Sequence, residues 1–97
     1  MSKKTRLPQA KDILLIIATL RRCIPLDPDT RLVAGWRVSS KQTPNFRIHG
    51  VTNEVSWLVD IYAGQYHIVT VGSRFPEKCK TVPAIVNYLN RSLEVLP

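Results

Sequence analysis

The clearest pattern in the chain lies in residues 54–62, which read EVSWLVDIY. Every second residue is a β-branched or aromatic apolar side chain, and most residues between them are polar. A period of two is that of a strand with one buried face. The stretch therefore predicts a strand with Val55, Trp57, Val59 and Ile61 facing the core, and with Ser56, Leu58, Asp60 and Tyr62 facing away from it.

Weaker alternations flank this strand on both sides. Residues 31–39 and 46–51 precede it, and residues 66–71 follow it after Ala63-Gly64-Gln65. Connections as short as these join antiparallel neighbours. We therefore expect an antiparallel meander of three or four strands, which ends at the glycine- and proline-containing residues 72–76.

An amphipathic helix is predicted at each end of the meander. The first covers residues 8–23, and its apolar stripe consists of Ala10, Ile13, Leu14, Ile17, Leu20 and Ile24, widened by Ile16. The second begins near Thr81, a suitable N-cap, and its stripe consists of Val82, Ile85, Val86, Leu89 and Leu93. Because each helix has one apolar stripe to bury, the simplest α+β arrangement packs both helices on one face of the sheet. Trp36, Phe46 and Ile48 then join the core.

The length of 97 residues suits a single domain, which we place at residues 7–97 after a basic disordered arm at residues 1–6. The chain has 14 Lys and Arg against 7 Asp and Glu, a net charge of +7. Such an excess favours polyanionic partners such as DNA or RNA, although many small domains carry similar charge for solubility alone.

The sheet face turned away from the helices is the candidate site. By alternation it bears Arg31, Arg37, Arg47, His49, Ser56, Leu58, Asp60 and Tyr62, together with either Tyr66 or His67. Cations beside aromatic rings suit single-stranded nucleic acid, because bases stack on rings while Lys and Arg hold phosphates. An ordinary polar face is the second interpretation, and a dimer interface involving Val33, Leu58 and Tyr62 is the third.

The leading hypothesis is a nucleic-acid-binding module. Its predicted contact residues are Lys3, Lys4, Arg6, Arg31, Arg37, Arg47, His49, Tyr62, Arg74, Lys78 and Lys80. The alternative is a protein-interaction module, such as an accessory subunit, an inhibitor or a homodimer, which would use Leu15, Leu58 and Tyr62.

No catalytic or metal motif stands out, so we expect neither an enzyme nor a cofactor. Cys23, His49, His67 and Cys79 are each more than about ten residues apart, too far for the close ligand spacing of a zinc site. His67 and Asp60 flank one hairpin, with Ser56 nearby, and are the only candidate catalytic group, but such a pair is more often a surface ion pair or hydrogen bond. We expect Cys79 to be an inert thiol, despite the neighbouring Lys78 and Lys80.

Two unpaired cysteines favour a reducing, cytoplasmic location. The apolar run at residues 13–20 is far shorter than the roughly 20 residues that span a bilayer, so no membrane association is expected. The order helix, three strands, helix also occurs in double-stranded RNA-binding domains. That resemblance stops at topology, because no lysine-rich signature opens the second helix.

Overall fold

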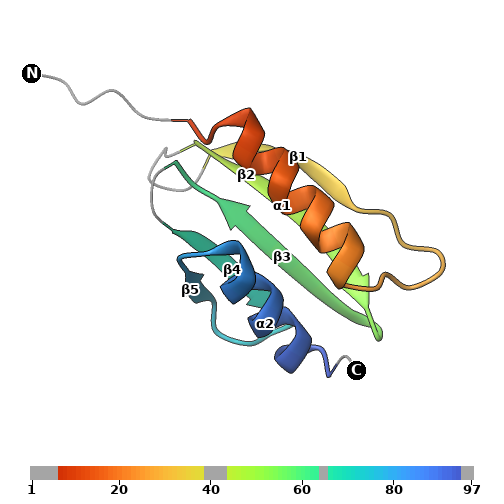
Figure 1. Ribbon diagram of the computed structural model, residues 1–97. Helices are drawn as coiled ribbons and strands as arrows, with labels where there is room; N and C mark the ends of the chain where they lie inside the picture. The colour runs from red at the N-terminus through yellow and green to blue at the C-terminus, as the bar shows by residue number, and fades with distance from the viewer. Residues whose placement is uncertain (1–6, 39–43, 64–65, 95–97) are drawn as a thin grey trace, which may run out of the picture.

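A helix, a run of strands and a second helix follow one another in the computed structural model, which describes residues 7–38, 44–63 and 66–94 (Figure 1). The elements are α1 (Ala10–Cys23), β1 (Val33–Val38), β2 (Pro44–Thr52), β3 (Val55–Ile61), β4 (His67–Val71), β5 (Glu77–Cys79) and α2 (Val82–Ser92). The α+β meander is confirmed, with five strands in the described residues rather than three or four. The predicted arm at residues 1–6 lies outside them.

The sheet is antiparallel throughout and keeps the order of the chain, β1-β2-β3-β4-β5. The extra strand is β5, which pairs with β4 through Glu77 and Val69, Lys78 and Ile68, and Cys79 and His67. A strand of three residues is too short to show a recognisable alternation. The sequence therefore predicts only a loop there.

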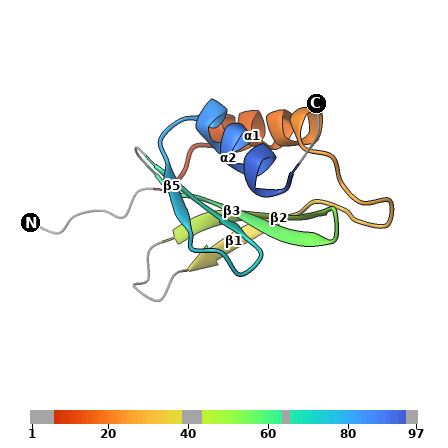
Figure 2. The same ribbon diagram turned by 90° about the horizontal axis from the view of Figure 1, so that it is seen from below.

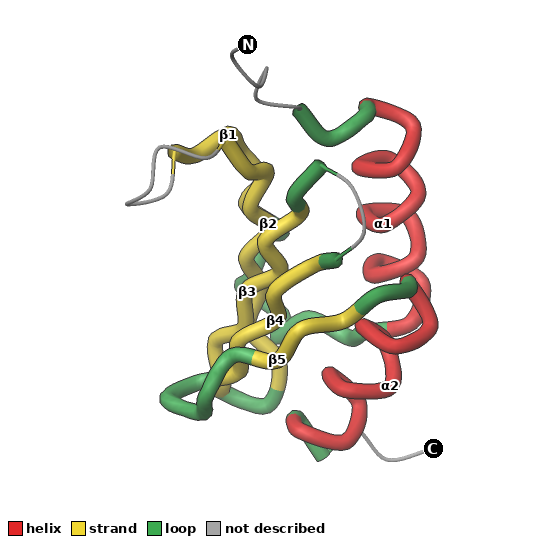
Figure 3. Tube along the Cα trace, turned by 90° about the vertical axis from the view of Figure 1, so that its left-hand side faces the viewer, coloured by secondary structure: helices red, strands yellow, loops and turns green. Residues whose placement is uncertain are grey.

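Both helices cover the same side of the sheet, as predicted (Figures 2 and 3). Each contributes one buried stripe. The buried apolar core consists of Ile13, Ile16, Leu20, Ile24, Ile48, Trp57, Val59, Ile61, Val69, Val71, Cys79, Ile85, Leu89 and Leu93. Within residues 7–38, 44–63 and 66–94, the opposite side of the sheet carries no helix, and we call it the open face.

The buried stripe of α1 is narrower than predicted. It runs through Ile13, Ile16 and Leu20, whereas Leu14 is 65% exposed. One helix packing on a sheet buries little more than a third of its circumference, so residues at the rim of the stripe reach solvent. Neither α1 nor α2, the helices of the described residues, has the length and apolar character to cross a membrane.

Trp36 does not join the core, which corrects a second prediction. Its position opposite Phe46 puts it on the helix side of the sheet, and the two rings meet edge to face with centroids 5.3 Å apart. However, β1 is an edge strand, and Figure 3 shows the sheet curving away from α1 there. Trp36 is therefore 55% exposed.

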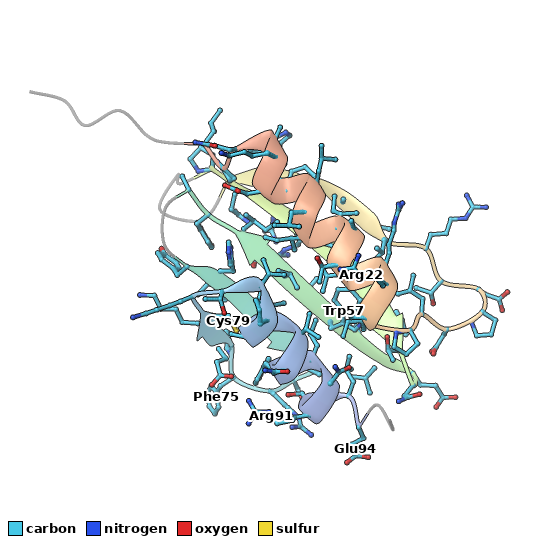
Figure 4. The ribbon with its side chains drawn as sticks, in the orientation of Figure 1. Arg22, Trp57, Phe75, Cys79, Arg91 and Glu94 are labelled. Atoms are coloured by element: carbon cyan, nitrogen blue, oxygen red, sulfur yellow. The ribbon has the colours of Figure 1, made fainter. Side chains whose placement is uncertain are left out.

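Trp57 anchors the middle of the core and lies over β3, between the two helices as seen in Figure 4. It is 1% exposed, and its indole N–H donates to Thr52 Oγ1 at 3.0 Å. Its cross-strand partner on β2 is Gly50, where any Cβ would overlap the indole ring. Only glycine leaves room for the tryptophan.

Candidate nucleic-acid interface

Strand register defines what the open face presents. Gly35 of β1 pairs with Arg47, Arg47 with Asp60, Asp60 with Ile68, and Ile68 with Lys78 of β5. Paired residues in an antiparallel sheet point to the same side. A single row of side chains therefore crosses all five strands, a width of about 19 Å at the usual strand spacing.

Two more rows lie beside this one, because residues two positions apart in a strand share a face. Arg37 pairs with Asn45 on one side, and Val33, His49 and Leu58 are paired in series on the other. Arg37 and Arg47 therefore lie on the same side of the sheet, away from the helices. Arg37 is exposed, so its guanidinium is accessible from solvent.

Arg47 is held by an acidic partner. Its Nε and one terminal nitrogen donate to the two carboxylate oxygens of Asp60, at 2.7 and 3.0 Å. The Asn45 amide also donates to Asp60, at 3.0 Å. The hydrogen bond with the carboxylate raises the pKa of Arg47. The sequence counts Arg47 as a binding cation, but its charge is largely neutralised within the sheet.

Aromatic side chains gather at the end of the open face nearest the β3–β4 connection. The Tyr62 and Tyr66 rings are stacked, with centroids 5.3 Å apart and planes 26° from parallel. The Lys78 ammonium lies 4.4 Å from the centroid of Tyr66. Partial burial, and then the neighbouring Asp60, raise the pKa of Tyr62. We call Tyr62, Tyr66 and Lys78 the tyrosine platform.

The sequence left open whether Tyr66 or His67 joins the open face. His67 pairs with Ile61, a core residue, and so points to the helix side. Tyr66, one residue earlier, points to the open face and stacks on Tyr62. Tyr66 was therefore missing from the predicted contact residues, and only the register could place it there.

The same register places Asp60 and His67, the candidate catalytic pair, on opposite sides of the sheet. Asp60 is opposite Ile68 on the open face and binds Arg47, whereas His67 lies on the helix side of the sheet. Burial lowers the pKa of His67, and its buried Nδ1 has no hydrogen-bond partner in the part of the chain that the structure describes. Cys79, opposite His67, is buried, and burial raises its pKa. Among the described residues, no group of three or more His, Cys, Asp or Glu side chains is placed to hold a metal ion.

The remaining predicted contact residues lie around the sheet. Arg31 precedes β1, Arg74 lies in the β4–β5 connection and Lys80 follows β5, all three exposed. Lys3, Lys4 and Arg6 lie outside the described residues.

The structure brings together two of the three residues of the alternative protein interface. Leu58 is partly buried and faces the open side of β3, four residues before Tyr62 along the chain, whereas Leu15 is 56% exposed on α1 in the helix layer. Leu15 and Tyr62 nevertheless line one hollow of about 360 Å³, whereas Leu58 does not line it.

In comparisons with protein-family models, curated proteins and solved structures, no match to this chain is found.

Proposed function

We propose that this chain binds single-stranded nucleic acid on its open face. The observation that carries the proposal is the tyrosine platform, a stacked pair of tyrosines with a cation held against one ring. Every base has a π-face, so stacking on such rings recognises unpaired bases with little dependence on sequence.

Cations lie at both edges of the sheet, one within the tyrosine platform and one across the sheet from it. Lys78 stands on β5 and the exposed Arg37 on β1, with the two tyrosines between them. A strand crossing the sheet would place bases over the tyrosines and phosphates beside the cations. The net charge of +7 strengthens this attraction at long range.

Fluorescence anisotropy with labelled DNA and RNA oligonucleotides of about 12 nucleotides, within the usual range of site sizes, tests the proposal. We expect binding at low salt that weakens linearly with the logarithm of salt concentration. Tyr66→Ala removes the ring against which both Tyr62 and Lys78 pack, so it should lower the affinity about fivefold or more, an effect the size of losing one stacked base. A wild-type chain that binds no oligonucleotide at low salt would refute the proposal.

Phe75→Ala is the matched control. Phe75 is 93% exposed and projects outward from the β4–β5 connection (Figure 4). It lies beyond the end of β4 opposite to Tyr66, a strand length of roughly 17 Å away. Its truncation removes an equally accessible ring without touching the tyrosine platform, so the affinity should not change.

A protein-interaction module is the second candidate, favoured by one observation on the helix layer. Leu14 and Leu15 are 65% and 56% exposed, and Leu15 borders a hollow of about 420 Å³ between α1 and α2 that Val82 and Val86 also line. Light scattering tests whether a second copy binds there. A dimer that Leu15→Asp converts to monomer would support this function, and a monomer at high concentration would exclude self-association.

A further inference from the structure

The open face has a hollow beside its β1 edge. It has a volume of about 330 Å³ and is lined by residues 33–37 of β1 together with Arg47, His49 and Leu58. The space exists because Gly35, at its centre, has no side chain. A Cβ built at Gly35 would meet no other atom of the described residues within 4 Å. We call this space the Gly35 hollow.

The lining combines an apolar surface with basic groups. Val33 and Leu58 flank His49 in one row and supply apolar contact area. Arg37 stands on the other side of Gly35 in the same strand, and Arg47 lies directly across from Gly35. Bases stack on planar guanidinium groups as well as on aromatic rings. The two hydrogen bonds to Asp60 hold the Arg47 guanidinium in a fixed plane beside the hollow.

We propose that the Gly35 hollow is a second subsite, which seats one unpaired base of the bound nucleic-acid strand. The inference rests on the proposed function and adds a specific contact to it. A planar, uncharged ring suits the half-buried backbone of Gly35 and the apolar Leu58, and the phosphates flanking it suit Arg37. β1 and the tyrosine platform are two to three strand spacings apart, about 10–14 Å, so one strand of several nucleotides reaches both.

Gly35→Val tests the subsite by filling it. The new side chain enters open space, and β-branched residues suit exposed strands, so the variant should fold with unchanged or slightly higher stability. Its affinity for a labelled oligonucleotide of about 12 nucleotides should fall fivefold or more, as when one stacked base is lost. Ser56→Val is the matched control, because it adds a similar side chain to an exposed position on the open face away from the hollow.

An abasic strand of equal length separates base binding from phosphate binding. Wild type should prefer the normal strand over the abasic strand, and Gly35→Val should reduce that preference while binding the abasic strand as wild type does. An equal loss on both strands would show that the valine obstructs the phosphate path, and would overturn the inference. Unchanged binding by Gly35→Val, alongside a loss in Tyr66→Ala, would overturn the subsite and leave the proposed function standing. A wild type that binds neither strand would remove both proposals.

Discussion

Replacing Asp60 by asparagine should destabilise the fold and strengthen nucleic-acid binding at the same time. Asp60 is 6% exposed and accepts three hydrogen bonds, two from Arg47 and one from Asn45. In Asp60→Asn the shape is kept, but one acceptor oxygen becomes an NH₂ donor. At least one donor of Arg47 then loses its partner, and the compensating negative charge is gone.

The stability loss follows from those contacts. A hydrogen bond to a charged group contributes about 1.5–3 kcal/mol. The Arg47 side chain is 31% exposed, so its guanidinium can turn to water, which keeps the loss below the 3–5 kcal/mol of a fully buried broken pair. We therefore expect Asp60→Asn to lower the free energy of unfolding by about 2–3 kcal/mol, or the melting temperature by roughly 10–20 °C.

The gain in binding follows because the Arg47 guanidinium loses its anionic partner. Arg47 becomes available for one more phosphate contact on the open face. Each contact with a single strand steepens the dependence of log K on log salt concentration by about 0.7. Asp60→Asn should therefore bind more tightly at low salt and with a slope steeper by about that amount.

Anisotropy titrations at several salt concentrations, with circular dichroism to confirm folding, measure both effects. Arg47→Gln is the partner control, since it should lose stability without gaining slope. A folded Asp60→Asn with the wild-type slope would show that the freed guanidinium of Arg47 does not reach the phosphates, and would refute the predicted gain in binding.

Two further predictions concern the helix side of the sheet. Gly50→Ala should lower the free energy of unfolding by about 3 kcal/mol or more, because its Cβ would overlap the buried Trp57 ring. Gly35→Ala, on the open face, is the control and should cost no stability. Equal urea midpoints for the two variants would contradict this packing. Burial lowers the pKa of His67 below 6.5, against the opposing charge of Asp12, so the unfolded chain binds protons that the native chain does not. The contribution of His67 to stability should therefore be complete above about pH 6.5 and be lost progressively as the pH falls below it, a loss that His67→Gln removes from urea midpoints.

Most of the fold could be predicted because its elements have clear periods. The alternation around Trp57 and the helical stripe ending at Leu93 each identify one element and its buried side. What could not be predicted depends on the ends and edges of elements. β5 is too short to show a period, and the exposure of Trp36 depends on how far the helices extend over an edge strand, which no local pattern records.

The candidate site was less predictable, because it depends on pairs. Arg47 and Asp60 are 13 positions apart, and only the β2–β3 register shows that they are cross-strand neighbours. A two-residue connection, Asn53 and Glu54, sets that register, and both residues adopt the positive φ of a tight hairpin turn. The choice between Tyr66 and His67 required the β3–β4 register in the same way. A slip of one residue would have exchanged their faces.

Stability alone does not explain the ion pair at the centre of the open face. Burying a carboxylate is costly, and apolar residues of similar shape in place of a buried pair are often as stable or more so. Arg47 and Asp60 also stand apart from the apolar core, which lies on the helix side of the sheet. What the pair does provide is a guanidinium fixed in orientation, beside the space that Gly35 leaves empty. A rigid planar cation next to an unfilled space has a use on a surface that receives a ligand, and no comparable use on a face that only meets water.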